Sequence, residues 1–141
     1  NLKSWIKKHI NINPQVEIGV ILSNYVNAMI DISDGLLIDL KRILNASKVG
    51  GEVYYEKIGV SQTLKEICKK YNYNEYEMVL SGGEDYILLF TISPNMEKKL
   101  KNEKIDYRII GKIINKPIDL IVYHKDKILK LKQSGYDHFE S

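Results

Sequence analysis

Residues 27–37 have the sequence NAMIDISDGLL, and the organisation of the chain follows from this stretch. The apolar run 28–32 predicts a short buried strand, interrupted near its end by Asp31. From Leu36 onward the apolar residues recur at helical spacing, which predicts a helix over 36–47 with one apolar face. Two carboxylates and a hydroxyl therefore stand where a strand passes into a helix N-terminus. The first N–H groups of a helix lack partners within it, so this place can bind a phosphate or a metal–phosphate complex.

The polar residues of this stretch, Asp31 to Gly35 (the first motif), have two possible roles. Ser33 or Asp34 can be a helix N-cap, because Ser and Asp are strongly preferred there, and Asp31 can satisfy a nearby backbone donor. Alternatively, the side chains bind a metal ion. Asp31 favours the metal, because a carboxylate at the end of an apolar strand is expected to be desolvated and to need a positive partner.

A second polar stretch, the second motif, consists of Ser81-Gly82-Gly83-Glu84-Asp85-Tyr86 and stands directly before a predicted strand over 86–92. Its glycines allow positive φ angles or the close approach of a ligand. It can also be a plain glycine turn followed by solvated acids. It is not a Walker loop, because the sequence Gly-Lys-Ser/Thr is missing.

The two motifs, in this order and about fifty positions apart, resemble the carboxy-terminal domain of thiamine-monophosphate kinase, a family of the aminoimidazole-ribonucleotide-synthetase-related superfamily. The closing Gly135-Tyr136-Asp137-His138-Phe139 also resembles that family, so the similarity covers nearly the whole chain. The resemblance implies an α+β fold with a mixed β-sheet covered by helices. Residues 14–141 are then the domain, and residues 1–13 a linker or first helix from a missing amino-terminal domain.

The resemblance also implies an activity, the ATP-dependent phosphorylation of thiamine monophosphate to thiamine diphosphate, with Mg²⁺ as cofactor. Phosphoryl transfer depends on positioning and charge neutralisation, so no catalytic acid or base is expected. The residues that inherit roles are Asp31 and Asp34 as metal ligands, Ser33 as an ATP contact, and Glu84 and Tyr136 as substrate contacts. The alternative for Tyr136 is that its ring only packs to close the core.

The expected partners are thiamine monophosphate, ATP and the protein's own amino-terminal domain, with a homodimer in the full-length protein. The amino-terminal domain is expected to supply further metal-binding acids, so the chain alone should be inactive. Two other classes remain open: a non-catalytic phosphate- or nucleotide-binding module, and another ATP-dependent enzyme of the same superfamily.

The composition narrows the function classes. A hydrophobic content of 44% with 28% charged residues predicts one soluble domain, and no apolar run reaches membrane-spanning length. The single cysteine, Cys68, excludes an internal disulfide and fits a cytoplasmic location; its place on an apolar stripe predicts a core residue. The net charge of +3 comes from scattered lysines, which does not indicate a nucleic-acid-binding surface.

The remaining elements follow from periodicity, caps and turns. Helices are expected from Asn13-Pro14 to about 25, after Ser61, over 75–80, and from Ser93-Pro94 to about 104, with a helix stop at 48–51. The other expected strands are 52–56, 107–114, 118–123 and 127–131, the last two joined by a turn at 124–126 with His124 on the surface.

Overall fold

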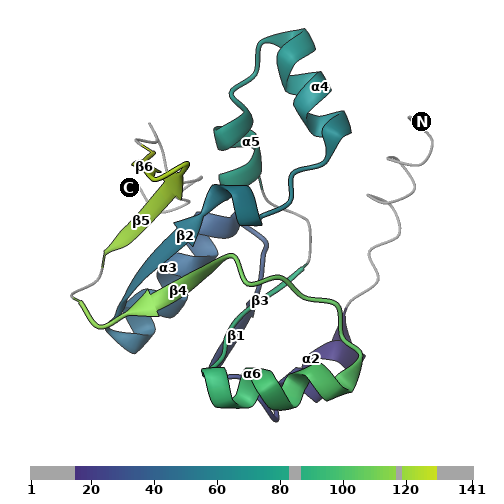
Figure 1. The fold of residues 1–141 in the computed structure, drawn as a ribbon, viewed down its shortest axis with the longest axis vertical. Coiled ribbons are helices and arrows are strands. Elements are labelled where there is room, and N and C mark those ends of the chain that lie inside the picture. The colour runs from purple at the N-terminus through teal and green to yellow at the C-terminus, as the bar shows by residue number, and fades with distance from the viewer. Residues whose placement is uncertain (1–14, 83–86, 117–118, 130–141) are drawn as a thin grey trace, which may run out of the picture.

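The computed structural model describes residues 15–82, 87–116 and 119–129. Figure 1 shows α2 and α6 beside one end of β1 and β3, and α4 and α5 at the opposite end of the molecule. The helices are α2 (Val16–Leu22), α3 (Leu36–Ser47), α4 (Gln62–Tyr71), α5 (Glu75–Leu80) and α6 (Pro94–Leu100), with 3₁₀ helices η1 (Tyr55–Lys57) and η2 (Lys101–Glu103). The strands are β1 (Ala28–Asp31), β2 (Gly50–Tyr54), β3 (Leu88–Thr91), β4 (Gly111–Ile114), β5 (Leu120–His124) and β6 (Lys127–Ile128).

The described strands form two sheets. β1 and β3 pair antiparallel, and the larger sheet has the order β4-β2-β5-β6. Within the larger sheet β2 and β5 are parallel, whereas β4 and β6 pair antiparallel with their neighbours. The expected α+β fold with a mixed sheet is confirmed. The sequence did not predict that the strands divide into two sheets, because periodicity does not show which strands pair.

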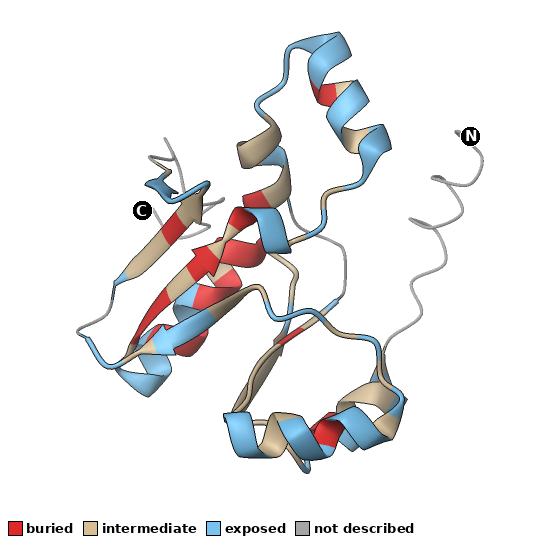
Figure 2. Cartoon of the chain, viewed as in Figure 1, coloured by how far each residue is buried: buried red, intermediate tan, exposed pale blue. Residues whose placement is uncertain are grey.

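The core lies between α3 and the larger sheet, as the red residues in Figure 2 show. The apolar face predicted for the 36–47 helix is confirmed, and its bounds are those of α3. Burying one leucine contributes about 1.5–3 kcal/mol, so this helix supplies much of the stabilisation of the domain. The side chains of this core are Leu36, Leu37, Leu40, Ile43 and Leu44 of α3, with Val53, Tyr55, Leu80, Leu89 and Val122.

The helix boundaries follow from local chemistry. Ser61 and Ser93 cap α4 and α6 by accepting hydrogen bonds from backbone N–H groups, as predicted. α3 ends at the predicted place, but its left-handed residue is Lys48 (φ 54°) and not a glycine. Gly51 belongs to β2 instead, where a Cβ would lie 3.1 Å from a Leu44 methyl group. A side chain at this position would press against Leu44 of α3, so the glycine suits the close helix–sheet packing.

Several predicted strands are too long. The clearest case is 107–114, of which only Gly111–Ile114 is strand β4. The strand predicted at 52–56 is displaced, because β2 begins at Gly50 and the chain leaves it after Tyr54 to form η1. The placement of His124 was wrong: it is the last residue of β5, half-buried, and the hairpin turn is made by Lys125 and Asp126 with positive φ. His124 is half-buried in the sheet, and the polar residues around it in the sequence do not indicate this burial. Cys68 is buried, as expected.

Four side chains, Tyr55, Glu75, Tyr76 and His124 (the Tyr55 cluster), tie α5 to the larger sheet. The Tyr55 hydroxyl donates to Glu75 Oε1 at 2.7 Å, and the Tyr76 hydroxyl lies 2.9 Å from Nδ1 of His124. The Tyr55 ring meets the rings of Tyr76 and His124 edge-on, with centroids 4.7 and 5.2 Å apart. Because α5 runs directly into the second motif, this cluster fixes where that motif begins.

The Tyr55 cluster should make folding sensitive to alkaline pH. Burial, and then the hydrogen bond to Glu75, raise the pKa of Tyr55 far above its usual value. The unfolded chain ionises this phenol above a pH of about 10, whereas the folded chain keeps it neutral, so stability falls as pH rises through that value. In urea denaturation series from pH 8 to 11, Tyr55→Phe should show a shallower fall than the unmodified protein. Equal slopes in the two proteins would contradict the structure.

Candidate functional site

The pairing of β1 with β3 brings the two motifs to the same end of the small sheet. Asp31, the last residue of β1, stands opposite Leu88, the first residue of β3. The register continues one step further, since Ile32 N–H donates to the carbonyl of Ile87 at 2.9 Å. The first motif follows β1 and the second precedes β3. The antiparallel pair therefore places the end of β1, which leads into the first motif, beside the start of β3, although the two motifs are about fifty positions apart in sequence.

Gly35 makes the contact between the motifs. Its backbone has φ 120° and ψ 151°, a region essentially restricted to glycine. A Cβ at this position would lie 2.8 Å from the carbonyl oxygen of Ser81. The last residue of the first motif therefore packs directly on the first residue of the second, and only glycine allows that approach.

The carboxylate of Asp31 is exposed, and β1 is only half-buried. The expectation that Asp31 is desolvated by its strand was therefore wrong, because the two-stranded sheet does not enclose its end. The side chain needs no positive partner for stability, and its carboxylate is open to a ligand.

The N-cap alternative for Ser33 and Asp34 was also wrong. Gly35 precedes the first turn of α3, and no side chain caps it. The loop is held by Asp39 instead, whose side chain is 0% exposed. Its Oδ2 accepts hydrogen bonds from the backbone N–H groups of Ser33 at 2.9 Å and Asp34 at 3.1 Å.

Arg42 completes this arrangement by contacting two carboxylates. Its Nη1 lies 2.5 Å from Oδ1 of Asp39, and its Nη2 lies 2.5 Å from Oδ2 of Asp34. The hydrogen bond to Asp34, followed by that to Asp39, raises the pKa of Arg42 above its usual value. The guanidinium is therefore a permanent positive charge beside the first motif.

Asp39 and Arg42 were not among the residues predicted from the sequence to form the site. A signal was present, because Asp39 is a carboxylate within the apolar face of α3, three residues before an arginine. A charge in that position must be paired or hydrogen-bonded when it is buried. Only the folded loop shows that its partners are backbone N–H groups of the first motif.

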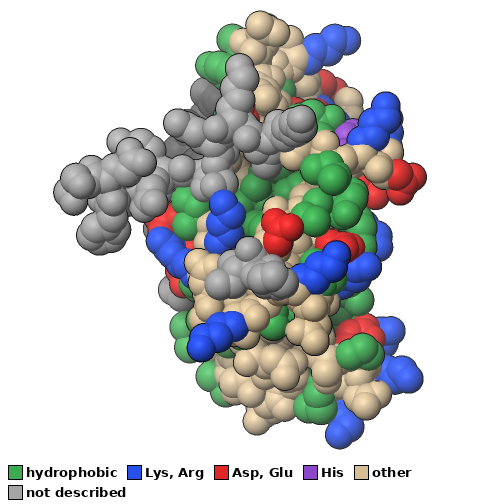
Figure 3. Space-filling view, turned by 90° about the vertical axis from the view of Figure 1, so that its left-hand side faces the viewer, with side chains coloured by type: hydrophobic (Ala, Val, Ile, Leu, Met, Phe, Trp, Pro, Cys, Tyr) green, Lys and Arg blue, Asp and Glu red, His purple; other side chains and the backbone are tan. Residues whose placement is uncertain are grey.

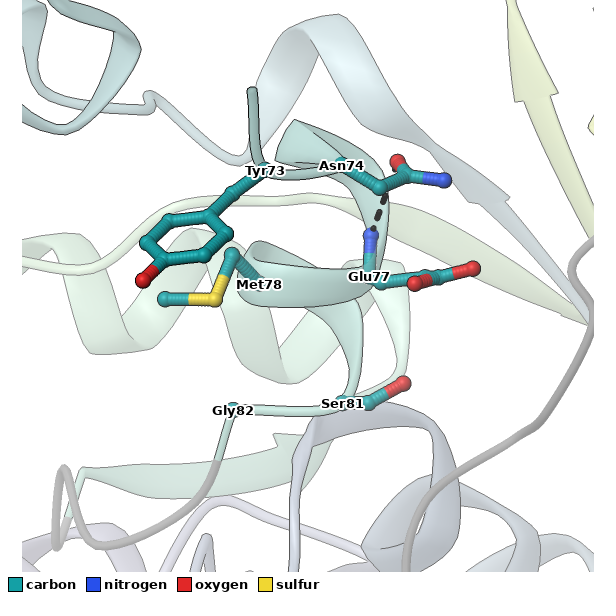
Figure 4. A pocket seen from close by; sticks show the side chains of 6 residues that line it. All are labelled: Tyr73, Asn74, Glu77, Met78, Ser81 and Gly82. Atoms are coloured by element: carbon teal, nitrogen blue, oxygen red, sulfur yellow. Dashed lines mark hydrogen bonds between the residues drawn. The ribbon is translucent and has the colours of Figure 1, made fainter. Parts of the chain in front are cut away.

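A shallow, open depression of about 270 Å³ lies where the second motif begins. Figure 4 shows the Tyr73 ring, the Met78 thioether and the side chain of Ser81 around it. Gly82, which lines it, passes close to α5: a Cβ there would lie 2.4 Å from the Met78 carbonyl oxygen. The depression is lined by Tyr73, Asn74, Glu77, Met78, Ser81 and Gly82.

The donor set for a metal ion is small. Among the described residues, no group of three or more His, Cys, Asp or Glu side chains is placed to hold a metal. Asp31 at the end of β1 and Asp34 in the loop after it provide two carboxylates, and Mg²⁺ commonly uses one or two carboxylates together with water and substrate phosphates. The first motif fits part of a shared magnesium site and does not fit a closed protein cage.

A profile of the family described as AIR synthase related protein, C-terminal domain, matches residues 7–123. The chain belongs to this family. Thiamine-monophosphate kinase from Buchnera aphidicola subsp. Acyrthosiphon pisum is 37% identical over 145 residues, covering 99% of this chain and 44% of the relative. The enzyme of the same name from Aquifex aeolicus is 37% identical over 108 residues, covering 77% of this chain and 34% of the relative.

Solved structures of this AIR synthase-related family agree with the fold. AaThiL complexed with AMPPCP and TMP has a TM-score of 0.75 at 33% identity, covering 96% of this chain and 41% of that chain. Escherichia coli HypE, a hydrogenase maturation protein, has a TM-score of 0.65 at 13% identity, covering 89% of this chain and 41% of that chain, which supports the fold alone. The chain therefore spans less than half the length of these relatives.

Of the residues predicted to form the site, the structure places Asp31 at the end of β1 and Ser33 and Asp34 in the loop that follows it. Glu84 and Tyr136 lie outside the described residues.

The structure also bears on membrane and nucleic-acid partners. No helix in the described ranges is long and apolar enough to cross a membrane. On the face drawn in Figure 3, lysine and arginine side chains are dispersed among acidic ones and do not form one basic patch.

Gly35→Ala should separate the two motifs. The substitution strains a backbone of φ 120° and drives a methyl group against the Ser81 carbonyl, so we expect a loss of about 1–3 kcal/mol in the free energy of unfolding. Gly19→Ala in α2 is the matched control, because its nearest neighbour would lie at an ordinary 3.7 Å. The control should be neutral or about 1 kcal/mol more stable. Urea denaturation measures both, and equal stability of the Gly35 variant would refute the contact.

Proposed function

We propose that the protein containing this chain transfers the γ-phosphoryl group of ATP to the phosphate of thiamine monophosphate, giving thiamine diphosphate. The relatives named thiamine-monophosphate kinase support this reaction, as does the related structure complexed with AMPPCP, an ATP analogue, and TMP. The observation in this chain that carries the proposal is the contact between Gly35 and Ser81, which joins the two motifs into one site.

The chemistry suits this arrangement. Both reactants are polyanions, so their reaction requires positive charge and alignment more than proton transfer. In the proposal Asp31 and Asp34 hold Mg²⁺, which supplies that charge when it is bound. Ser33 contacts ATP from the same loop. Because Asp39 already holds the backbone of this loop, the site needs little reorganisation when the nucleotide arrives.

The substrate end of the site is assigned to the second motif and the C-terminus. We place the Glu84 carboxylate against the cationic thiazolium ring of thiamine monophosphate, a pairing favoured by charge. Tyr136 is proposed to stack on the same substrate.

The wider organisation is part of the same proposal. Residues 14–141 form the carboxy-terminal domain, and residues 1–13 link it to an amino-terminal domain that contributes further metal-binding acids. The full-length protein is proposed to be a cytoplasmic homodimer that acts without contacts to nucleic acid or membrane.

The metal role is tested in the full-length protein with Mg²⁺, ATP and thiamine monophosphate. Asp31→Asn and Asp34→Asn should each lower kcat/KM by about a hundredfold or more, because each removes a negative ligand without changing side-chain size. Asp106→Asn, at an exposed position outside the site, should keep normal activity. No thiamine diphosphate from the folded, unmodified protein would reject the thiamine assignment. Normal activity in both loop variants would reject the metal role.

The substrate contacts predict separate kinetic effects. Glu84→Gln should raise the KM for thiamine monophosphate by about tenfold and leave the KM for ATP unchanged, because only the charge facing the thiazolium is lost. Tyr136→Leu should raise the same constant several-fold, whereas Tyr136→Phe keeps the aromatic ring and should behave normally. If Tyr136 only closes the core, Tyr136→Leu will lower the free energy of unfolding and leave KM unchanged.

A further inference from the structure

The carboxylate of Asp39 accepts hydrogen bonds from the first motif and from Arg42. Oδ2 receives two backbone N–H groups of the loop, and Oδ1 receives the guanidinium. A fully buried carboxylate with three donors is a rigid element, because leaving any donor unpaired is costly. Asp39 therefore restricts the conformation of the loop.

Arg42 transmits this restriction to one side chain. Its planar guanidinium places Nη1 on Asp39 and Nη2 on Oδ2 of Asp34, so the orientation of Asp34 is tied to the buried carboxylate. The ion pair with Arg42 uses Oδ2 of the Asp34 carboxylate. Arg42 is 51% exposed and Asp34 is 31% exposed, so the pair adds little to fold stability.

We propose that Asp39 and Arg42 are positioning residues of the phosphoryl-transfer site, which hold the Asp34 carboxylate in one orientation for a divalent cation. The inference rests on the proposed function. Asp39 fixes the backbone, and Arg42 fixes the side chain. Arg42 also places a positive charge beside the cation, which weakens binding of the bare metal while keeping its ligand in place.

Because Arg42 has this double role, removing it should strengthen metal binding and lower kcat. In Arg42→Met the full-length protein should bind Mn²⁺, used as the probe with AMPPCP present, about fourfold more tightly, because a neighbouring cation is gone. The kcat for thiamine diphosphate formation should fall about tenfold, because Asp34 is no longer oriented. Arg42→Lys keeps the charge but cannot contact both carboxylates. It should bind Mn²⁺ normally and have a kcat between those of Arg42→Met and the unmodified protein.

The decisive step repeats Arg42→Met in an Asp34→Asn background. If Arg42 acts through Asp34, both effects should shrink to less than about twofold there, since interacting residues are not additive. Arg108→Met is the matched control, because this arginine donates to the carbonyls of Ile58 and Gly59; it should leave Mn²⁺ binding and kcat unchanged.

Three results would overturn the inference: full-sized effects of Arg42→Met in the Asp34→Asn background, weaker Mn²⁺ binding in Arg42→Met, or no change in either quantity. Failure of the proposed function is distinguishable, because it appears as missing thiamine diphosphate formation in the unmodified protein. The Mn²⁺ titration does not depend on the thiamine substrate and still tests the link from Arg42 to Asp34.

Discussion

The buried carboxylate of Asp39 is the interaction on which the site depends. A charge with no exposed surface must have all its hydrogen-bonding capacity matched, and here the partners are the loop backbone and a guanidinium. The loop between β1 and α3 is thereby held by the helix that supplies most of the core. Because α3 is fixed by apolar packing, Asp39 on this helix also fixes the loop that carries the polar side chains of the first motif.

The second motif depends on a different constraint. α5 carries it, and the Tyr55 cluster fastens α5 to the larger sheet through two hydrogen bonds and edge-on ring contacts. The first motif meets it through Gly35, where the absence of a side chain lets two backbones touch. Both α3, which follows the first motif, and α5, which leads into the second, are thus fastened to the larger sheet.

Within the described residues the first motif offers two carboxylates, which is consistent with a site shared with other groups. Asp31 at the end of β1 and Asp34 in the loop after it, already paired with Arg42, do not by themselves enclose a divalent cation. They can contribute ligands to a cation that also binds phosphate oxygens. Because Arg42 partly neutralises Asp34, the carboxylates of Asp31 and Asp34 repel each other less before a cation binds.

The sequence by itself determined the α3 helix, the helix caps at Ser61 and Ser93, the α+β class and the two motifs. The helix, the caps and the motifs depend on local periodicity and on residue chemistry that acts within a few positions, whereas the α+β class was expected from the resemblance that the two motifs carry. The tertiary structure alone decided that Gly35 touches Ser81, that Asp31 is exposed, that His124 ends a strand, and that Asp39 and Arg42 hold the loop. Each of these depends on residues brought together by sheet pairing or burial, and a single sequence does not record which distant partners a polar side chain will meet.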